Sequence, residues 1–184
     1  GLAALREVRK RTDNVLLIND GPYGTTCARV GCMPSKALIE AANAFHQRHR
    51  FAAFAIRGSD QLSVDVPAVL ERVRCLRDRF VRGVLKTTAD LGPRNLAGRA
   101  RLLGPHRVEV NQEQFDAKRI IIATGSRPII PAAWQAFSGR ILTSDNLFDQ
   151  EDLPRRIAVI GLGVIGVEIA QALSACARPE DKPF

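Results

Sequence analysis

The sequence predicts an α/β fold, in which helices and strands alternate along the chain. Residues 15–18 (Val-Leu-Leu-Ile) follow a predicted helix over residues 1–10 and have the continuous apolar character of a buried parallel strand. Residues 157–160 form a second predicted strand, which a glycine-rich turn and a helix follow directly. The chain has 184 residues and 46% hydrophobic content, which is enough for one or two domains with an apolar core.

Two longer helices and several short elements are expected between these segments. Residues 35–48 place apolar side chains on one face of a helix. A second helix begins after Asp65, its predicted N-cap, with Cys75 as a packing residue near its apolar stripe. The remaining predicted elements are strands over residues 96–103, 107–110 and 114–123, a linker from Pro128, and a short capped helix over residues 143–148.

The sequence predicts two domains, residues 1–153 and residues 154–184. The first helix has no strand before it, and the tail from Ser174 lacks the apolar strand that a Rossmann unit places next. We therefore expect the chain to be part of a longer protein, through truncation, a frameshift or a partial sequence.

Composition excludes several classes of partner. The net charge is +8, but the basic residues are scattered, and the densest group, residues 72–79, alternates with core positions of a helix. Aromatic residues make up only 5% of the chain, so no nucleic-acid partner is expected. No apolar run reaches the length of a membrane helix and no signal peptide is visible, so no membrane association is expected. Four cysteines in a chain of this size are typical of a reducing compartment, and we expect a cytoplasmic location.

Cys27 and Cys32 are the leading candidates for chemistry. On a regular helix their spacing gives a rise of about 7.5 Å and a rotation of roughly 140°. A disulfide needs Cα atoms within about 4.4–6.8 Å, so the two residues can pair only if the helix is distorted between them. Gly31 and Pro34 supply the means, because glycine relaxes the backbone and proline removes a donor.

The spacing alone leaves four interpretations open: a labile redox disulfide, a structural disulfide, two reduced buried cysteines, and half of a zinc site. Zinc sites usually have shorter cysteine spacings and need two more ligands. The other candidates are not in ligand-like spacing with the pair, so no metal site is expected; they are Cys75, Cys176, His46, His49 and His106.

Three glycines follow the strand predicted at residues 157–160. Gly161, Gly163 and Gly166 form a G-x-G-x-x-G pattern between that strand and a helix. In such a pattern the glycines provide a tight turn, close approach of the backbone to a pyrophosphate, and close helix packing. The pattern by itself is weak evidence, but strand, turn and helix stand in the expected order.

Residues 24–36 resemble the redox-active segment of the flavoprotein disulfide reductases. The usual form is Gly-Gly-Thr-Cys-x-x-x-Gly-Cys-x-Pro-Ser-Lys, and this chain departs from it only by Thr25 in place of the second glycine. Residues 121–128 resemble the family's Ala-Thr-Gly turn, and residues 157–168 resemble its nicotinamide-domain fingerprint. The resemblance covers nearly the whole chain and is strongest to the dihydrolipoamide dehydrogenase branch.

The resemblance implies an FAD-binding Rossmann-like domain with an inserted β-meander, plus the first βα unit of an NAD(P)-binding Rossmann domain. It implies an oxidoreductase that passes electrons between NAD(P)(H), FAD and a redox-active cysteine pair. The substrate would be a small dithiol or disulfide such as a lipoyl group, and the full-length protein would be a homodimer. Mercuric and glutathione reductase-like enzymes are alternatives.

The resemblance also assigns roles to residues. Cys27 would exchange with the substrate, Cys32 would lie against the flavin, and Lys36 would lie near flavin N5 and pair with Glu168. The expected FAD contacts are Gly1 (the last glycine of a first G-x-G-x-x-G), Thr26, Ala100, Thr124, Gly125 and Ser126; the expected NAD(P) contacts are Gly161, Gly163 and Gly166. The acidic residue that binds the FAD ribose in the family falls on Asn19, with Asp20 next to it.

Other parts of the family's machinery have no match in this sequence. None of the three histidines matches the family's catalytic His-Glu pair, and the aspartate that contacts the flavin ribitol or phosphate is absent. We therefore expect this chain alone to be inactive and to bind FAD poorly. A non-catalytic nucleotide-binding remnant is a further alternative, but such a module needs no exchange thiols.

Overall fold

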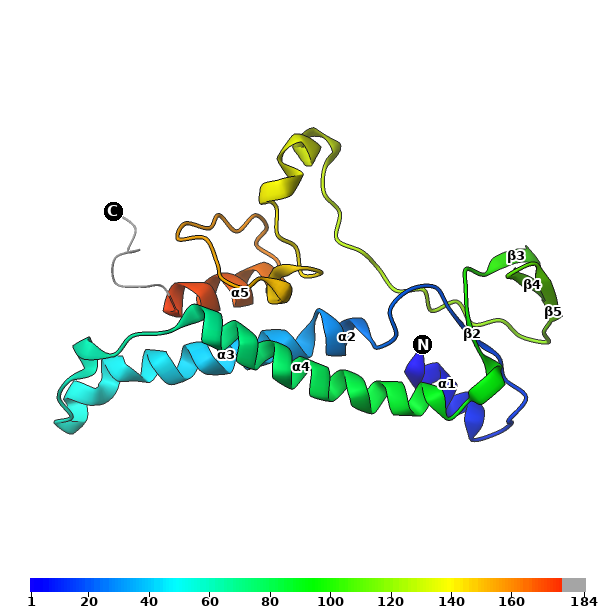
Figure 1. The fold of residues 1–184 in the computed structure, drawn as a ribbon, viewed down its shortest axis with the longest axis horizontal. Helices are drawn as coiled ribbons and strands as arrows, with labels where there is room; N and C mark the ends of the chain where they lie inside the picture. The colour runs from blue at the N-terminus through cyan, green and yellow to red at the C-terminus, as the bar shows by residue number, and fades with distance from the viewer. Residues whose placement is uncertain (177–184) are drawn as a thin grey trace. The chain divides into compact units, whose positions relative to one another are not determined.

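The computed structural model describes residues 1–176 (Figure 1). The chain divides into two compact units. The first unit consists of residues 1–26 and 80–127, and the second of residues 27–79 and from 128 onward. Helix α4 (Val66–Ala89) contributes residues to both. The predicted domain boundary at residues 153–154 falls inside the second unit and stays a prediction. The tail beyond Cys176, predicted to lack a strand, lies outside the described residues.

The first unit combines a parallel strand pair with a small antiparallel sheet. Helix α1 (Leu2–Arg9) precedes β1 (Leu17–Asn19), which pairs in parallel with β2 (Asn95–Ala97). The antiparallel sheet has the order β3-β4-β5, formed by Arg101–Gly104, Arg107–Val110 and Glu113–Asp116. The buried apolar side chains of the first unit are Leu5, Leu91, Val108 and Val110. The mixed helix and strand content with a parallel pair agrees with the predicted α/β class.

The predicted strands in this unit are longer than the observed ones. The Val15 N–H donates to the Asp13 carbonyl at 2.9 Å, and this turn delays β1 to Leu17. The segment predicted at residues 96–103 is two strands, because the chain leaves the parallel pair after Ala97. The strand predicted at residues 114–123 ends at Asp116. Asp116 pairs with Arg107, the first residue of β4, so β4 has no residue left with which a longer β5 could pair.

The second unit is built around three helices, α3 (Cys32–His46), the first part of α4, and α5 (Val164–Ala175). Helices α3 and α5 pack against each other (Figure 1). A buried cluster joins the helices to a short 3-10 helix at Leu147–Asp149, which lies at the end of the short capped helix predicted over residues 143–148. The members of the cluster are Leu38, Ala42, Val73, Leu147, Phe148, Ala172 and Cys176. Residues 27–29 of the short helix α2 (Thr26–Arg29) and 3-10 segments at Gln47–Phe54, Ser59–Gln61 and Ala132–Arg140 complete the unit.

The two long central helices lie close to their predicted positions. The helix predicted at residues 35–48 is α3, which begins three residues earlier and ends at His46, where 3-10 structure continues. The Asp65 carboxylate accepts a hydrogen bond from the Ala68 N–H at 3.1 Å, which confirms the predicted N-cap of α4. The prediction for Cys75 is wrong, because this side chain is exposed on α4 rather than packed.

The strand predicted at residues 157–160 is absent. These residues have no regular structure, and Ile157, Val159 and Ile160 are 41%, 39% and 73% exposed. A strand exists only when a neighbouring strand accepts and donates its backbone hydrogen bonds. No described strand pairs with this segment, so its apolar character is not sufficient to form one.

Candidate active site

The backbone departs from helical geometry between Cys27 and Cys32, as the spacing predicted. Cys27 lies in α2 and Cys32 is the first residue of α3, and the two helices are separated at residues 30–31. Gly31 adopts φ −122° and ψ −116°, outside the helical region. Pro34 is buried in the first turn of α3, where its missing N–H removes no helical hydrogen bond. Pro34 therefore favours the start of the second helix rather than disrupting a continuous one.

Both cysteines are free thiols that interact with each other. Cys27 is half-buried and Cys32 is exposed. A hydrogen bond with the Cys32 side chain raises the pKa of the Cys27 thiol, and partial burial and charge on Cys32 raise it further. Cys27 therefore holds its proton to a higher pH than an isolated thiol does. Two thiols that interact in this way can be oxidised to a disulfide.

Lys36 and Glu168 meet although 132 positions separate them. The Lys36 Nζ lies 2.7 Å from both carboxylate oxygens of Glu168. Lys36 lies on the second turn of α3 and Glu168 on the second turn of α5, and buried Leu38 and Ala172 pack in the shared core of these helices. The two side chains are 59% and 39% exposed, so solvent screens the pair and its contribution to stability is small. In this pair the ammonium of Lys36, four residues after Cys32, is directed toward α5.

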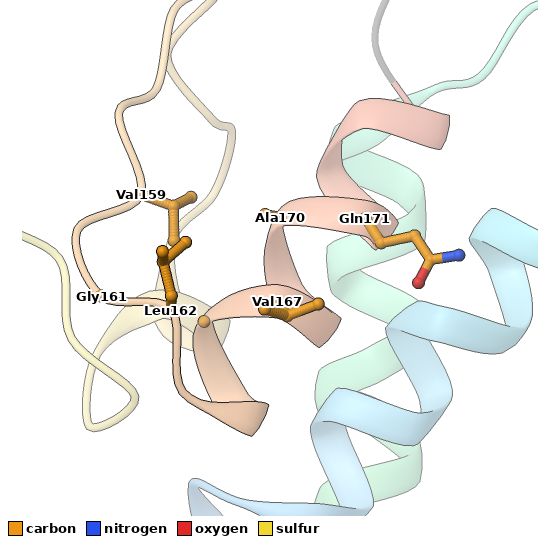
Figure 2. Close-up of a pocket in the computed structure, with 7 residues that line it drawn as sticks. Val159, Gly161, Leu162, Val167, Ala170 and Gln171 are labelled. Carbon is orange, nitrogen blue, oxygen red and sulfur yellow. The ribbon is translucent and has the colours of Figure 1, made fainter.

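The glycines of the G-x-G-x-x-G pattern form a tight turn into α5. Gly161 has φ +112°, and Gly163 is the N-cap of the helix. A Cβ on Gly166 would overlap the Gly161 carbonyl oxygen, so the turn closes on itself at that point. The turn and the first turns of α5 line a pocket of about 390 Å³, whose walls include Val159, Leu162, Val167, Ala170 and Gln171 (Figure 2). The local turn forms without the preceding strand that the sequence predicted.

The first unit contains most of the residues expected to contact FAD. Gly1 is the N-cap of α1, and a Cβ there would lie 3.8 Å from the Ala123 Cβ, so the start of this helix adjoins the segment that carries Thr124, Gly125 and Ser126. Thr124 and Ser126 are exposed, and Gly125 has φ +76°. Ala100 is exposed between β2 and β3, and Thr26 is the first residue of α2. The structure brings Gly1 and the Ala-Thr-Gly turn together.

The Asn19 amide donates to the Gly21 carbonyl at 2.8 Å, while Asp20 is exposed. Asp20 lies between the two residues that this bond joins and is exposed. Whether either residue contacts a ribose stays a prediction.

Sequence reasoning missed one polar group beside the cysteine motif. The Tyr23 hydroxyl donates to the Asn95 side-chain oxygen at 2.8 Å, in a partly buried position. The available signal was that Tyr23 is the one tyrosine of the sequence and stands four residues before Cys27.

Two further searches concern only the described part of the chain. Within residues 1–176, no three His, Cys, Asp or Glu side chains are grouped so that they could hold a metal ion. Among the helices formed by these residues, none is both long and apolar enough to cross a membrane.

Comparison with known proteins identifies relatives of the chain. Residues 1–179 match the family model described as pyridine nucleotide-disulphide oxidoreductase. The dihydrolipoyl dehydrogenase of Thermus scotoductus is 34% identical over 162 residues, which cover 85% of this chain and 34% of that protein. That of Mycoplasma pneumoniae is 29% identical over 174 residues, covering 92% of this chain and 38% of that protein. The chain thus spans about a third of the length of these relatives.

Solved structures show the same fold. The Cu(II) complex of the HOCl-induced flavoprotein disulfide reductase RclA from Escherichia coli has a TM-score of 0.73 at 22% identity, covering 95% of this chain and 37% of that one.

Proposed function

The chain belongs to the pyridine nucleotide-disulphide oxidoreductase family, and we propose that the protein carrying it is an FAD-dependent dithiol/disulfide oxidoreductase, most like dihydrolipoyl dehydrogenase. The observation that supports this most strongly is the hydrogen-bonded pair Cys27 and Cys32 at the break between two helices. A module that only bound nucleotides would have no use for two facing thiols.

The exchange chemistry of the pair follows from the two sulfurs. With the pair oxidised, a substrate thiolate attacks the Cys27 sulfur, forms a mixed disulfide and releases Cys32 as a thiolate. The second substrate thiolate then attacks the substrate sulfur of that mixed disulfide and releases Cys27. The substrate leaves as a disulfide and the protein keeps two thiols, so two electrons have passed to the pair. The raised pKa of Cys27 means that the released sulfur readily takes up a proton.

Residues of this chain fit both nucleotides. The turn closed by Gly161 and Gly166, with Gly163 at the N-cap of α5, offers backbone N–H groups to the pyrophosphate of NAD(P). Gly1, Thr26, Ala100, Thr124, Gly125 and Ser126 are the proposed FAD contacts. Bound flavin and nicotinamide supply two-electron transfer, while the protein supplies position and charge. Lys36 stands four residues after Cys32 and is paired with Glu168. We assign the positive charge of Lys36 to stabilise negative charge beside the flavin.

The finer assignments belong to the same proposal. The domains are residues 1–153 for FAD, with the antiparallel sheet β3-β4-β5 as the inserted meander, and residues 154–184 for the start of the NAD(P) domain. A lipoyl dithiol is the preferred substrate class, with a cytoplasmic homodimer as the working form. Mercuric and glutathione reductase-like activities are the alternatives within the family.

The test uses the full-length flavin-loaded protein with NADH or NADPH and three acceptors: lipoamide, glutathione disulfide and Hg(II). We expect reduction of lipoamide, loss of at least about a thousandfold in Cys27→Ser because the exchange sulfur is gone, and wild-type rates in Cys75→Ser, which removes an exposed thiol outside the site. Turnover with another acceptor would move the protein to another branch of the family. Flavin binding with no thiol-dependent turnover on any acceptor would contradict the proposal.

A further inference from the structure

The loop that leads into Cys27 is held by the side chain of Tyr23. Residues 20–25 connect β1 to α2 without regular structure, and Gly21 and Gly24 have φ +125° and +114°. Glycine at both positions gives the loop unusual conformational freedom. Between them, the Tyr23 hydroxyl donates to the Asn95 side-chain oxygen at 2.8 Å.

Asn95 is itself fixed by two other elements. It is the first residue of β2 and pairs in register with Leu17 of β1. Its amide nitrogen lies 3.3 Å from the carbonyl of Thr88, a residue 4% exposed near the end of α4. Because a carbonyl can only accept, this contact sets the orientation of the Asn95 amide and turns its oxygen toward the tyrosine. The Tyr23 hydroxyl therefore donates to an acceptor that is already immobilised.

We propose that Tyr23 and Asn95 are positioning residues for the exchange thiol: their hydrogen bond restricts the glycine-flanked loop and thereby limits the exposure of Cys27. This inference rests on the proposed function, in which Cys27 is the sulfur that meets substrate. Three residues separate Tyr23 from Cys27, so a change in the loop is passed along the chain directly to the start of α2. We call the Tyr23–Asn95 hydrogen bond the tether, and its effect is to keep Cys27 half-buried.

The test measures the loop and the thiol separately, in the reduced full-length protein. Hydrogen exchange reports on residues 21–26, and iodoacetamide labelling followed by mass spectrometry gives the alkylation rate of each cysteine between pH 6 and 10. Trypsin cleaves after Arg29, so Cys27 and Cys32 fall in separate peptides. The variants are Tyr23→Phe, which removes only the hydroxyl, Asn95→Ala, which removes the acceptor, and the double variant.

We expect Tyr23→Phe to speed exchange in the loop and alkylation of Cys27 by about three- to tenfold, the range for losing one ordinary hydrogen bond. Alkylation of exposed Cys75 should not change. Asn95→Ala should have a similar effect, and the double variant should add little to either. Asn95→Ala also provides the test if Tyr23→Phe does not fold.

Two results would overturn the inference: loop exchange unchanged in both single variants, or faster loop exchange with an unchanged alkylation profile of Cys27. The second would mean that the bond is only structural. Neither readout needs flavin or turnover. Failure of the wild-type enzyme assay therefore counts against the proposed function. Hydrogen exchange and alkylation test the role of the Tyr23–Asn95 bond independently of that assay.

Discussion

Replacing Gly166 by alanine tests whether residues 161–166 form a phosphate-binding turn. An added Cβ would lie inside 3.0 Å of the Gly161 carbonyl oxygen, closer than real Cβ atoms come, and the obstacle is backbone rather than a flexible side chain. The carbonyl or the start of α5 would have to move by about 1 Å to relieve the overlap, which costs about 1–3 kcal/mol in a packed structure. Alanine's better helix propensity offsets up to about 1 kcal/mol of this. The net loss of stability should therefore lie between about 0 and 3 kcal/mol.

The same displacement moves the N–H groups at the start of α5. Hydrogen bonds to a charged phosphate are worth about 1.5–3 kcal/mol, so losing the alignment of one should weaken NAD(P) binding by about 10- to 100-fold. The assays are thermal unfolding and nucleotide titration by calorimetry on the full-length protein. Gly139→Ala is the matched control, since a Cβ there meets nothing within 4 Å, and both properties should stay at wild-type values.

Gly163→Ala separates the two effects. Gly163 has φ −72° and open space around it, so alanine fits and stability should change little. Nucleotide binding should still fall, because the glycine is proposed to admit the pyrophosphate. A Gly166→Ala protein that unfolds at the wild-type temperature and binds nucleotide normally would refute the turn geometry.

Three smaller predictions concern single interactions. Asp65→Ala should lower the free energy of unfolding by about 1 kcal/mol, measured by urea denaturation, because it removes the bond that caps the Ala68 N–H of α4. Gly83→Ala on the same helix should raise it by about 0.5–1 kcal/mol, since the added Cβ meets nothing within 4 Å; a lower value would mean that this helix does not persist there. Cys32→Ser should lower the pKa of Cys27 toward the ordinary thiol value, because the hydrogen bond and charge that raise it are weakened, and alkylation of Cys27 should then begin at a lower pH; an unchanged profile would show that the two thiols do not interact in solution.

Local chemistry in the sequence was enough to predict α3 to within three residues at each end and the start of α4. The N-cap at Asp65, the glycine turn before α5 and the break between the two cysteines each depend on a few neighbouring residues. The meeting of Lys36 and Glu168 is not local, and only the resemblance to a family predicted it. Their contact depends on α3 packing against α5 through a shared apolar cluster.

The sequence was less informative where a structure depends on a distant partner. Residues 157–160 have the composition of a strand, but composition cannot supply the neighbouring strand that pairs with it. Cys75 lies near an apolar stripe in the sequence, yet its side chain is exposed on α4. Tyr23 and Asn95 are 72 positions apart and carry no motif, so only the fold reveals their hydrogen bond.

The measurement that tests the central claim most directly is differential thiol labelling of the full-length flavin-loaded protein before and after anaerobic addition of NADH or NADPH. The account predicts that two thiols per chain become reactive, one in the tryptic peptide that contains Cys27 and one in the peptide that contains Cys32. Exposed Cys75 should label equally before and after addition, since it takes no part. Reactivity of Cys27 and Cys32 that is the same with and without the reduced nucleotide would contradict the assignment of these residues as the redox pair.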